Sequence, residues 1–154
     1  MMMLDDAGGR LADDGPNGMD GGWRPLDSVR QTGFENALPP LDVRPVPGGA
    51  EMRTRPHAGC ANVMGSLHGG FLSALAEQSL FLPLYLHGRC SRGGIVVIDF
   101  SLSFLASGDI ATPIVARLEL LRETGRMAFV RGTLWQGDVA ITAYSGTVRK
   151  LDKR

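Results

Sequence analysis

The sequence predicts an α+β domain in which one apolar helix packs against an antiparallel sheet. Residues 70–86 have the pattern of a single helix. Residues 95–150 have the pattern of four long strands joined by short turns, with no helix between them. Helices and antiparallel strands that are segregated along the chain are typical of α+β domains.

The helix, GFLSALAEQSLFLPLYL, leaves no wide polar face. A helix that is apolar on every side is covered by the rest of its protein. Pro83 should kink this helix or end its regular part near Leu82, because proline has no backbone N–H to donate. We therefore expect a curved sheet to wrap around it.

The strands are clearest in the second half of the chain. Residues 114–122, 127–136 and 139–150 are expected strands, joined by the turns ETGR and GD. Met127, Phe129 and Trp135 are expected in the core, which is favoured over the lining of a pocket. The alternation in 95–105 predicts one face with Val96, Ile98, Phe100, Leu102 and Phe104, and an opposite face with Ile95, Val97, Asp99, Ser101 and Ser103.

The first part of the chain is less regular. Residues 1–22 are rich in Gly and Asp and are predicted to be a disordered leader, which leaves residues 23–154 as a single domain. Residues 24–38 are expected to include a short helix broken near Gly33. The segments LDVRPV and EMRTRP are short strand candidates joined by PGG.

Composition narrows the class of protein. The chain has 154 residues, 16 basic and 16 acidic, and no basic stripe with interleaved aromatic residues, which argues against a nucleic-acid partner. Its apolar runs are too short to span a bilayer, and its acidic start does not resemble a secretory signal. Cys60 and Cys90 are too few for a disulfide framework and are expected to be reduced thiols, so we expect a cytoplasmic protein.

Glu77 lies in the middle of the apolar helix, where we expect it to be buried. A buried carboxylate needs a partner or a raised pKa. One interpretation is an ion pair with an arginine, or exposure of Glu77 to solvent through a gap in the sheet. The other is a carboxylate placed in a cleft for chemistry.

The segment before the helix favours chemistry. Gly69 and Gly70 stand where the helix begins, so unpaired backbone N–H groups and the positive end of the helix dipole point outward. Such groups suit a developing oxyanion, and glycine lets a substrate approach closely.

The pattern Asn62-x₅-His68-Gly69-Gly70-x₆-Glu77, entering an apolar helix and followed by four long strands, resembles the hotdog-fold acyl-CoA thioesterases of the phenylacetic-acid-degradation type. The resemblance covers roughly residues 34–150. It implies a long central helix wrapped by a curved antiparallel sheet of five to six strands, in a homodimer or a dimer of dimers with sites at the subunit interface.

The resemblance also implies residue roles. Gly69 would donate its N–H to the thioester carbonyl, Glu77 would activate water or attack the carbonyl, and Asn62 would orient substrate or water. His68 would polarise the carbonyl or, as the more common use of such a histidine, cap local backbone. Gly70 would line the substrate site, and no metal or cofactor is expected beyond the coenzyme A of the substrate.

Coenzyme A carries phosphates, so basic side chains are expected at the entrance. Arg122 and Arg126, in the predicted hairpin RETGR, are the leading candidates, and Gly125 between them is expected to contact the substrate as well. Weaker candidates are Arg89, Arg92 and Lys150.

Geometry alone then predicts a shared site. Gly69 and Glu77 are eight positions apart, or about 12 Å along one helix. Reacting groups must approach to about 3–3.5 Å. If both residues act on one carbonyl, they must come from different chains of a two-fold dimer.

The chain departs from the family pattern in its hydroxyl groups. Related enzymes place a serine or threonine near the acid to hold water, either one turn later, at Phe81, or on the next long strand, at Val97. Both positions are apolar here. Ser73, Ser79 or Ser101 is a candidate substitute.

The sequence leaves three functions open. The leading one is hydrolysis of an aryl or medium-chain acyl-CoA. A hotdog hydratase or dehydratase acting on enoyl thioesters would need His57 or His68 to reach Glu77. A non-catalytic acyl-CoA binding module is the third, and the missing hydroxyl favours it. A metal site at His57, Cys60 and His68 lacks the paired ligand spacing of zinc sites.

Overall fold

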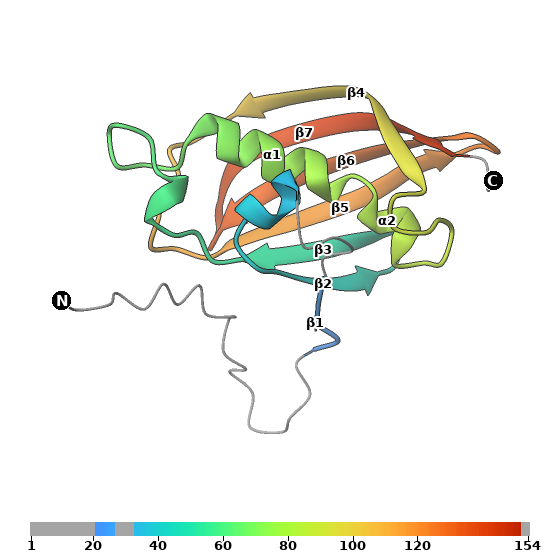
Figure 1. Ribbon diagram of the computed structural model, residues 1–154, viewed down its shortest axis with the longest axis horizontal. Coiled ribbons are helices and arrows are strands. Elements are labelled where there is room, and N and C mark those ends of the chain that lie inside the picture. Colours follow the sequence, from blue (N-terminus) through green and yellow to red (C-terminus); the bar gives the residue numbers. More distant parts are fainter. Residues whose placement is uncertain (1–20, 27–32, 152–154) are drawn as a thin grey trace.

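The computed structural model describes residues 21–26 and 33–151, which form one seven-stranded antiparallel sheet with a helix across it (Figure 1). The sheet order is β1-β2-β3-β5-β6-β7-β4. The strands are β1 (Arg24–Pro25), β2 (Leu41–Val46), β3 (Gly49–Thr54), β4 (Ile95–Phe104), β5 (Ile114–Glu123), β6 (Met127–Gln136) and β7 (Val139–Lys150). The short helices are η1 (Phe34–Ala37), η2 (Ala58–Cys60) and α2 (Leu82–Tyr85), and the long one is α1 (Gly69–Ser79).

Helix α1 lies on one face of the sheet and contacts β4, β5 and β7. Its regular part ends at Ser79, and the chain turns through Leu80 and Phe81 into α2, where Pro83 stands in the first turn. Proline fits there because first-turn N–H groups have no partner within a helix. The break comes earlier than the expected position near Leu82.

The core lies between α1 and the sheet. Alternate residues of β6 and β7 face the helix, among them Val130, Leu134 and Tyr144. The expectation for Met127, Phe129 and Trp135 is wrong. They occupy the other face of β6, outside the core cluster, and Phe129 is exposed. Aromatic content suggested burial, but the period of two along β6 places them opposite Val130 and Leu134.

The expected faces of β4 are wrong in its first half, because the strand contains a bulge, whereas Phe100 and Leu102 share one face as expected. Its register against β7 shifts between Val97 and Asp99. One extra residue at Ile98 reverses the alternation, so Ile95 and Val97 share the helix-facing side with Phe100. Phe100 packs partly buried against the core, and its ring centroid lies 6.3 Å from that of Tyr144.

The N-terminal region differs from the expected short helix. Arg24 and Pro25 form β1, an edge strand paired with β2, where a proline can be tolerated. After Gly33 the chain forms only η1. The predicted disordered leader, residues 1–22, falls outside the described residues except for a turn at 21–22.

The hotdog fold is confirmed, with a longer sheet than the five to six strands expected, because β1 adds a short seventh. The sheet does not encase α1 on all sides. One open sheet covers one side of a helix, and the side that carries Gly70 and Glu77 remains exposed in the single chain. Within the described residues no helix is long and apolar enough to cross a membrane.

Candidate active site

The loop before α1 is held by the side chain of Asn62. Its Oδ1 accepts the N–H groups of Met64 and Ser66 at 2.9 and 3.2 Å, and its Nδ2 donates to the Ser66 hydroxyl at 2.9 Å. The N–H of His68 bonds to the Cys60 carbonyl at 2.8 Å and closes the loop at its base. Asn62 therefore fixes the approach to the helix, and one of its two amide hydrogens remains for a ligand.

His68 is the N-cap of α1. Its Nδ1 accepts the N–H of Gly70 at 2.8 Å. This hydrogen bond matches the capping role foreseen for His68, and it occupies the N–H of Gly70. A side chain at position 70 would come within 2.9 Å of the imidazole ring, so glycine allows the ring to fold over the helix end.

The Gly69 N–H is one of the donors left at this end of α1. It has no acceptor among the described residues, as expected for the first turn of a helix. The ring of Phe104 packs on this glycine, where a Cβ would lie 3.0 Å from Cζ. Gly69, Asn62, Leu72 and Phe104 line a hollow of about 360 Å³, the Gly69 hollow. A backbone N–H with its helix dipole thus opens onto a space for a carbonyl oxygen.

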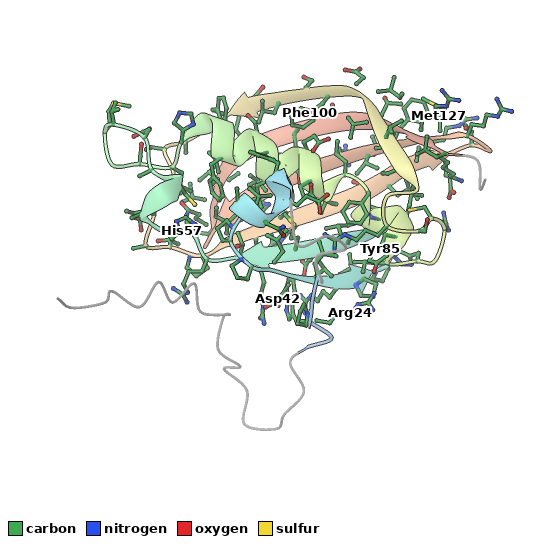
Figure 2. The ribbon with its side chains drawn as sticks, viewed as in Figure 1. Arg24, Asp42, His57, Tyr85, Phe100 and Met127 are labelled. Atoms are coloured by element: carbon green, nitrogen blue, oxygen red, sulfur yellow. The ribbon has the colours of Figure 1, made fainter. Side chains whose placement is uncertain are left out.

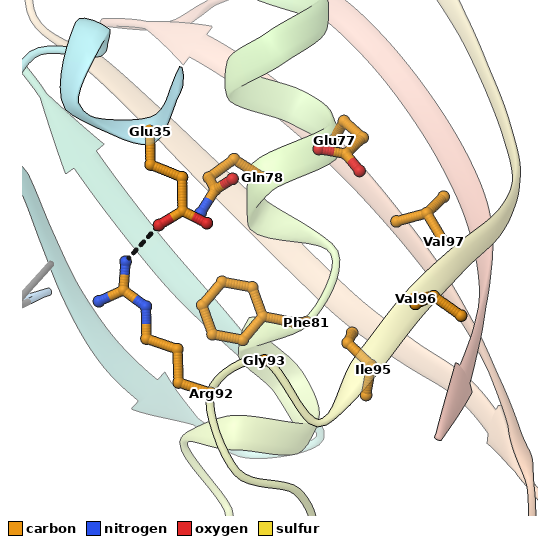
Figure 3. A pocket seen from close by; sticks show the side chains of 9 residues that line it. All are labelled: Glu35, Glu77, Gln78, Phe81, Arg92, Gly93, Ile95, Val96 and Val97. Carbon is orange, nitrogen blue, oxygen red and sulfur yellow. Dashed lines mark hydrogen bonds and ion pairs between the residues drawn. The ribbon is translucent and has the colours of Figure 1, made fainter. Parts of the chain in front are cut away.

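Glu77 opens onto a different hollow of about 330 Å³, the Glu77 pocket (Figure 3). Phe81 forms one wall, and Ile95 and Val97 at the start of β4 form another. The remaining polar groups come from Glu35, Gln78 and Arg92. The pocket combines apolar walls with a few polar groups, as small-molecule sites do.

The carboxylate of Glu77 is exposed rather than buried, which corrects the sequence expectation. It has no hydrogen bond or ion pair within residues 21–26 and 33–151, so no described arginine locks it in place. The pocket walls still remove enough water to raise the pKa of the Glu77 carboxyl, and the negative charge of Glu35 raises it further. A raised pKa suits a general base.

The two hollows share no lining residue although α1 contributes to both. Gly69 stands at the start of the helix, and Glu77 stands eight residues on, near its end. Within one chain the candidate oxyanion donor and the candidate base therefore face separate spaces.

A hydroxyl group is missing from the Glu77 pocket among its described residues, and Phe81 and Val97 both line it. Ser79 is buried, where its hydroxyl donates to the Ala76 carbonyl and pairs with the Tyr144 hydroxyl at 2.7 Å. The other two substitutes also lie elsewhere. The Ser73 hydroxyl donates to the Gly69 carbonyl at 2.8 Å, and Ser101 is exposed on β4 outside the pocket lining.

Gln78 offers the polar group that those serines do not. It follows Glu77 directly, lines the same pocket, and has no hydrogen-bond partner in the described part of the chain. Sequence reasoning missed it because a glutamine on a helix is usually a solvated residue, and nothing in the spacing marks this one.

The basic side chains expected to contact coenzyme A phosphates differ in whether they form ion pairs. Arg89 and Lys150 both pair with Glu123. Arg122 and Arg126 are exposed, and neither has an acidic partner among the described residues.

The β5–β6 hairpin that carries both arginines lies at the Glu77 end of the molecule. The Lys150 N–H donates to the Arg126 carbonyl, and Lys150 pairs with Ile95 of the pocket. Figure 2 places Met127, in the same hairpin, at the opposite end of the sheet from His57. Gly125 stands in open space at the tip, where an added Cβ would meet nothing within 4 Å.

Two further residues of the Glu77 pocket were not predicted from the sequence to line it. Glu35 was read as part of a short helix, and Arg92 only as a weak phosphate candidate. They lie 57 residues apart in sequence, and their side chains pair at 3.1 Å beside Gln78. No group of three or more His, Cys, Asp or Glu side chains within residues 21–26 and 33–151 could hold a metal ion.

Comparison with known proteins identifies the relatives of this arrangement. The family model of the thioesterase superfamily matches residues 64–143, more than half of the chain. No curated protein matches.

Solved structures with similar folds include two from Thermus thermophilus. The TT0310 protein is 25% identical, with a TM-score of 0.64 over 79% of this chain and 100% of that one. A mutant of the phenylacetic acid degradation protein PaaI is 26% identical, with a TM-score of 0.64 over 77% of this chain and 98% of that one. A hypothetical thioesterase from Streptococcus pneumoniae, solved with coenzyme A, is 16% identical, with a TM-score of 0.68 over 78% and 92% of the two chains, a likeness in fold alone.

The family match covers the end of the loop before α1, the helix with Glu77, and β4, β5, β6 and the first part of β7. On this ground the chain belongs to the thioesterase superfamily.

Proposed function

We propose that this protein hydrolyses an acyl-CoA thioester with an aryl or medium-chain acyl group, at a site shared by two subunits. The observation that carries the proposal is the separation of Gly69 and Glu77 into two hollows at opposite ends of one helix. Each hollow supplies half of what thioester hydrolysis needs, which is a donor for the oxyanion and a base for water.

Pairing of β4 with its copy in a second subunit would bring the two hollows together. Strand β4 pairs only with β7 among the described strands, so its other edge presents unpaired backbone groups. Ile98 and Phe104 on this strand are 54% and 55% exposed. A long, apolar edge of this kind favours pairing with a second copy.

Two-fold pairing of β4 would bring unlike ends together. In an antiparallel pair of identical strands, the start of one lies beside the end of the other. The start of β4, with Ile95 and Val97, lines the Glu77 pocket, and its end, with Phe104, lines the Gly69 hollow. The Gly69 hollow of one subunit would then adjoin Glu77 of the partner subunit.

The proposed reaction proceeds through one tetrahedral intermediate. Glu77 of the partner subunit takes a proton from water as the water oxygen attacks the thioester carbon. The Gly69 N–H donates to the resulting oxyanion, and Asn62 holds the loop that aims this N–H. The C–S bond then breaks, the coenzyme A sulfur takes the proton, and the free acid leaves.

Other groups support the acyl-CoA rather than the chemistry. Gln78, which lines the same pocket as Glu77, would hold the attacking water in place of the missing hydroxyl. Arg122 and Arg126, both exposed, would bind phosphates of coenzyme A. Gly125 between them leaves room for the ligand, and no resident cofactor or metal enters the proposal.

Subunit mixing tests the shared site. Gly69→Val and Glu77→Gln should each abolish release of free thiol from a panel of acyl-CoAs. Mixed, unfolded and refolded together, they should recover about a quarter of the wild-type rate, since half of random dimers are mixed and each holds one intact site. Melting curves of both variants check that they fold. No recovery from two folded, dimeric variants would contradict a shared site.

The same assays separate the other functions. Acyl-CoA binding by the wild type with no thiol release would favour a binding module, which the absence of a hydroxyl among the described pocket residues supports. Loss of the conjugated absorbance of an enoyl-CoA would favour a hydratase instead.

A further inference from the structure

A second hollow adjoins the Glu77 pocket. It measures about 270 Å³, and its apolar walls include Leu26, Leu38 and Leu41. Glu35, Gln78 and Arg92 line both spaces. These three polar residues therefore form a partition between the Glu77 pocket and an apolar hollow behind it, the rear hollow.

Arg92 is the least solvated charge in this partition. Its side chain is 13% exposed, and its Nη2 donates to Glu35 Oε2 at 3.1 Å. Its Nη1 is buried and has no hydrogen-bond partner in the part of the chain that the structure describes. Burying a donor without an acceptor is costly, so such a group in a folded protein calls for an explanation.

A contribution to the stability of the fold does not explain why Arg92 is buried here. The Glu35 side chain is 51% exposed, and ion pairs with one partner in water contribute little. An apolar side chain at position 92 would fill the space between the two hollows with no unmet donor. What distinguishes Arg92 is that its charge lies between the Glu77 pocket and the rear hollow.

We propose that Arg92, held by Glu35, is a specificity-determining residue that ends the acyl pocket and keeps alkyl chains out of the rear hollow. This inference rests on the proposed function, in which the acyl group enters the Glu77 pocket. Phe81, Val97 and the three partition residues line the same pocket, so an acyl group that fills this pocket would reach the partition as its chain lengthens. A short acyl group stops before it, whereas a longer alkyl chain would have to displace the guanidinium and strip water from Glu35.

The physical basis is the asymmetry between polar and apolar contacts. A methylene group gains free energy when apolar surface leaves water, but it gives Nη1 of Arg92 no acceptor. The partition therefore opposes chain extension although the rear hollow beyond it is lined by leucine and proline. Replacing Arg92 with a small apolar residue should join the two spaces.

The test compares wild type with Arg92→Ala and Arg92→Met. Binding of S-butyl-, S-octyl- and S-dodecyl-CoA thioethers, which cannot be hydrolysed, is measured by calorimetry, and thiol release is measured with acyl-CoAs of the same lengths. We expect the ratio of dodecyl to butyl affinity to rise about tenfold or more in Arg92→Ala, the effect of roughly two additional buried methylenes. Arg92→Met, which removes the charge and keeps the length, should lie between.

Arg131→Ala is the matched control, since Arg131 pairs with Glu119 at 2.6 Å on the outer face of the sheet. It should leave the ratio unchanged. An unchanged ratio in folded Arg92→Ala and Arg92→Met would overturn the inference. Thioether binding with the expected shift but no thiol release from any acyl-CoA would remove only the proposed hydrolysis, and no thioether binding by wild type would overturn both.

Discussion

The two ends of α1 are built in opposite ways. At the Gly69 end the backbone makes the site, and Asn62 and His68 hold the loop and the first turn of the helix through hydrogen bonds of 2.8 to 3.2 Å. At the Glu77 end the pocket is made of side chains, several of them charged, brought from separate segments of the chain.

This difference separates two physical tasks. An oxyanion donor works by fixed position, which hydrogen bonds to the main chain supply. A base works by its pKa, which requires neighbouring charge and partial loss of water, such as Glu77 receives from the pocket walls and Glu35. One helix holds both ends and keeps them too far apart to act on one carbonyl alone.

Removal of the base is the sharpest test of this division. Glu77→Gln should lower thiol release by about 10²–10⁴-fold, because it keeps the shape of the pocket and removes the proton acceptor. Size-exclusion chromatography should find the same oligomer as in wild type. Glu119→Gln, the same change on the outer face of the sheet, should turn over normally. Equal rates for the two variants would exclude Glu77 from the chemistry.

Separation of the subunits should lower the hydrolytic activity, because each proposed site needs one end of α1 from each subunit. Ile98→Lys places a charge on the exposed edge of β4 and should yield monomers, since edge charges oppose strand pairing. We expect at least about tenfold lower activity at concentrations where the variant is monomeric. Val139→Lys, at an apolar residue 49% exposed on β7, should remain dimeric and active. A fully active monomer would refute the shared site.

The basic hairpin should affect binding more than chemistry. Arg122→Gln with Arg126→Gln should raise KM about fivefold and leave kcat unchanged, because exposed charge contacts are weak. The effect should shrink at high salt and with dephospho-coenzyme A thioesters, which lack one phosphate. A lowered kcat with unchanged KM would show that the hairpin acts in another way.

The smallest expected effect is a shift in pH dependence. The base must be deprotonated to act, so activity should fall on the acid side at the pKa of Glu77, which lies above the ordinary glutamate value. Glu35→Gln removes a negative charge that raises this pKa and should move the acid limb of kcat/KM to lower pH. A limb that moves up, or does not move, would remove Glu35 as a cause.

Strand positions followed from local rules. Met127–Gln136 and Val139–Lys150 form strands over the residues predicted, because the turn between them contains Gly137, whose φ of 60° suits a glycine. The prediction of which strand residues face the helix was less accurate. On β4 a single bulge at Ile98 reversed half of the predicted alternation, and a bulge leaves little trace in residue type.

The candidate site shows the same difference between what local sequence predicts and what it does not. The Asn62, His68–Gly69–Gly70 and Glu77 pattern was visible because loop and helix residues lie close in sequence. Glu35, Gln78 and Arg92 were not, because the contact between Glu35 and Arg92 joins segments 57 residues apart. No periodicity connects such residues before the chain folds.

By itself the sequence determined the four long strands from residue 95 onward and a helix that carries a glycine and an acid eight residues apart. These depend on turn chemistry, side-chain period and helix rise, all of which act over a few neighbouring residues. Only the tertiary structure decided which spaces the two groups face, how much water surrounds Glu77, and that an arginine separates its pocket from the rear hollow. Those properties depend on which distant segments exclude solvent from a given atom, and that is settled only when these segments pack together in the folded chain.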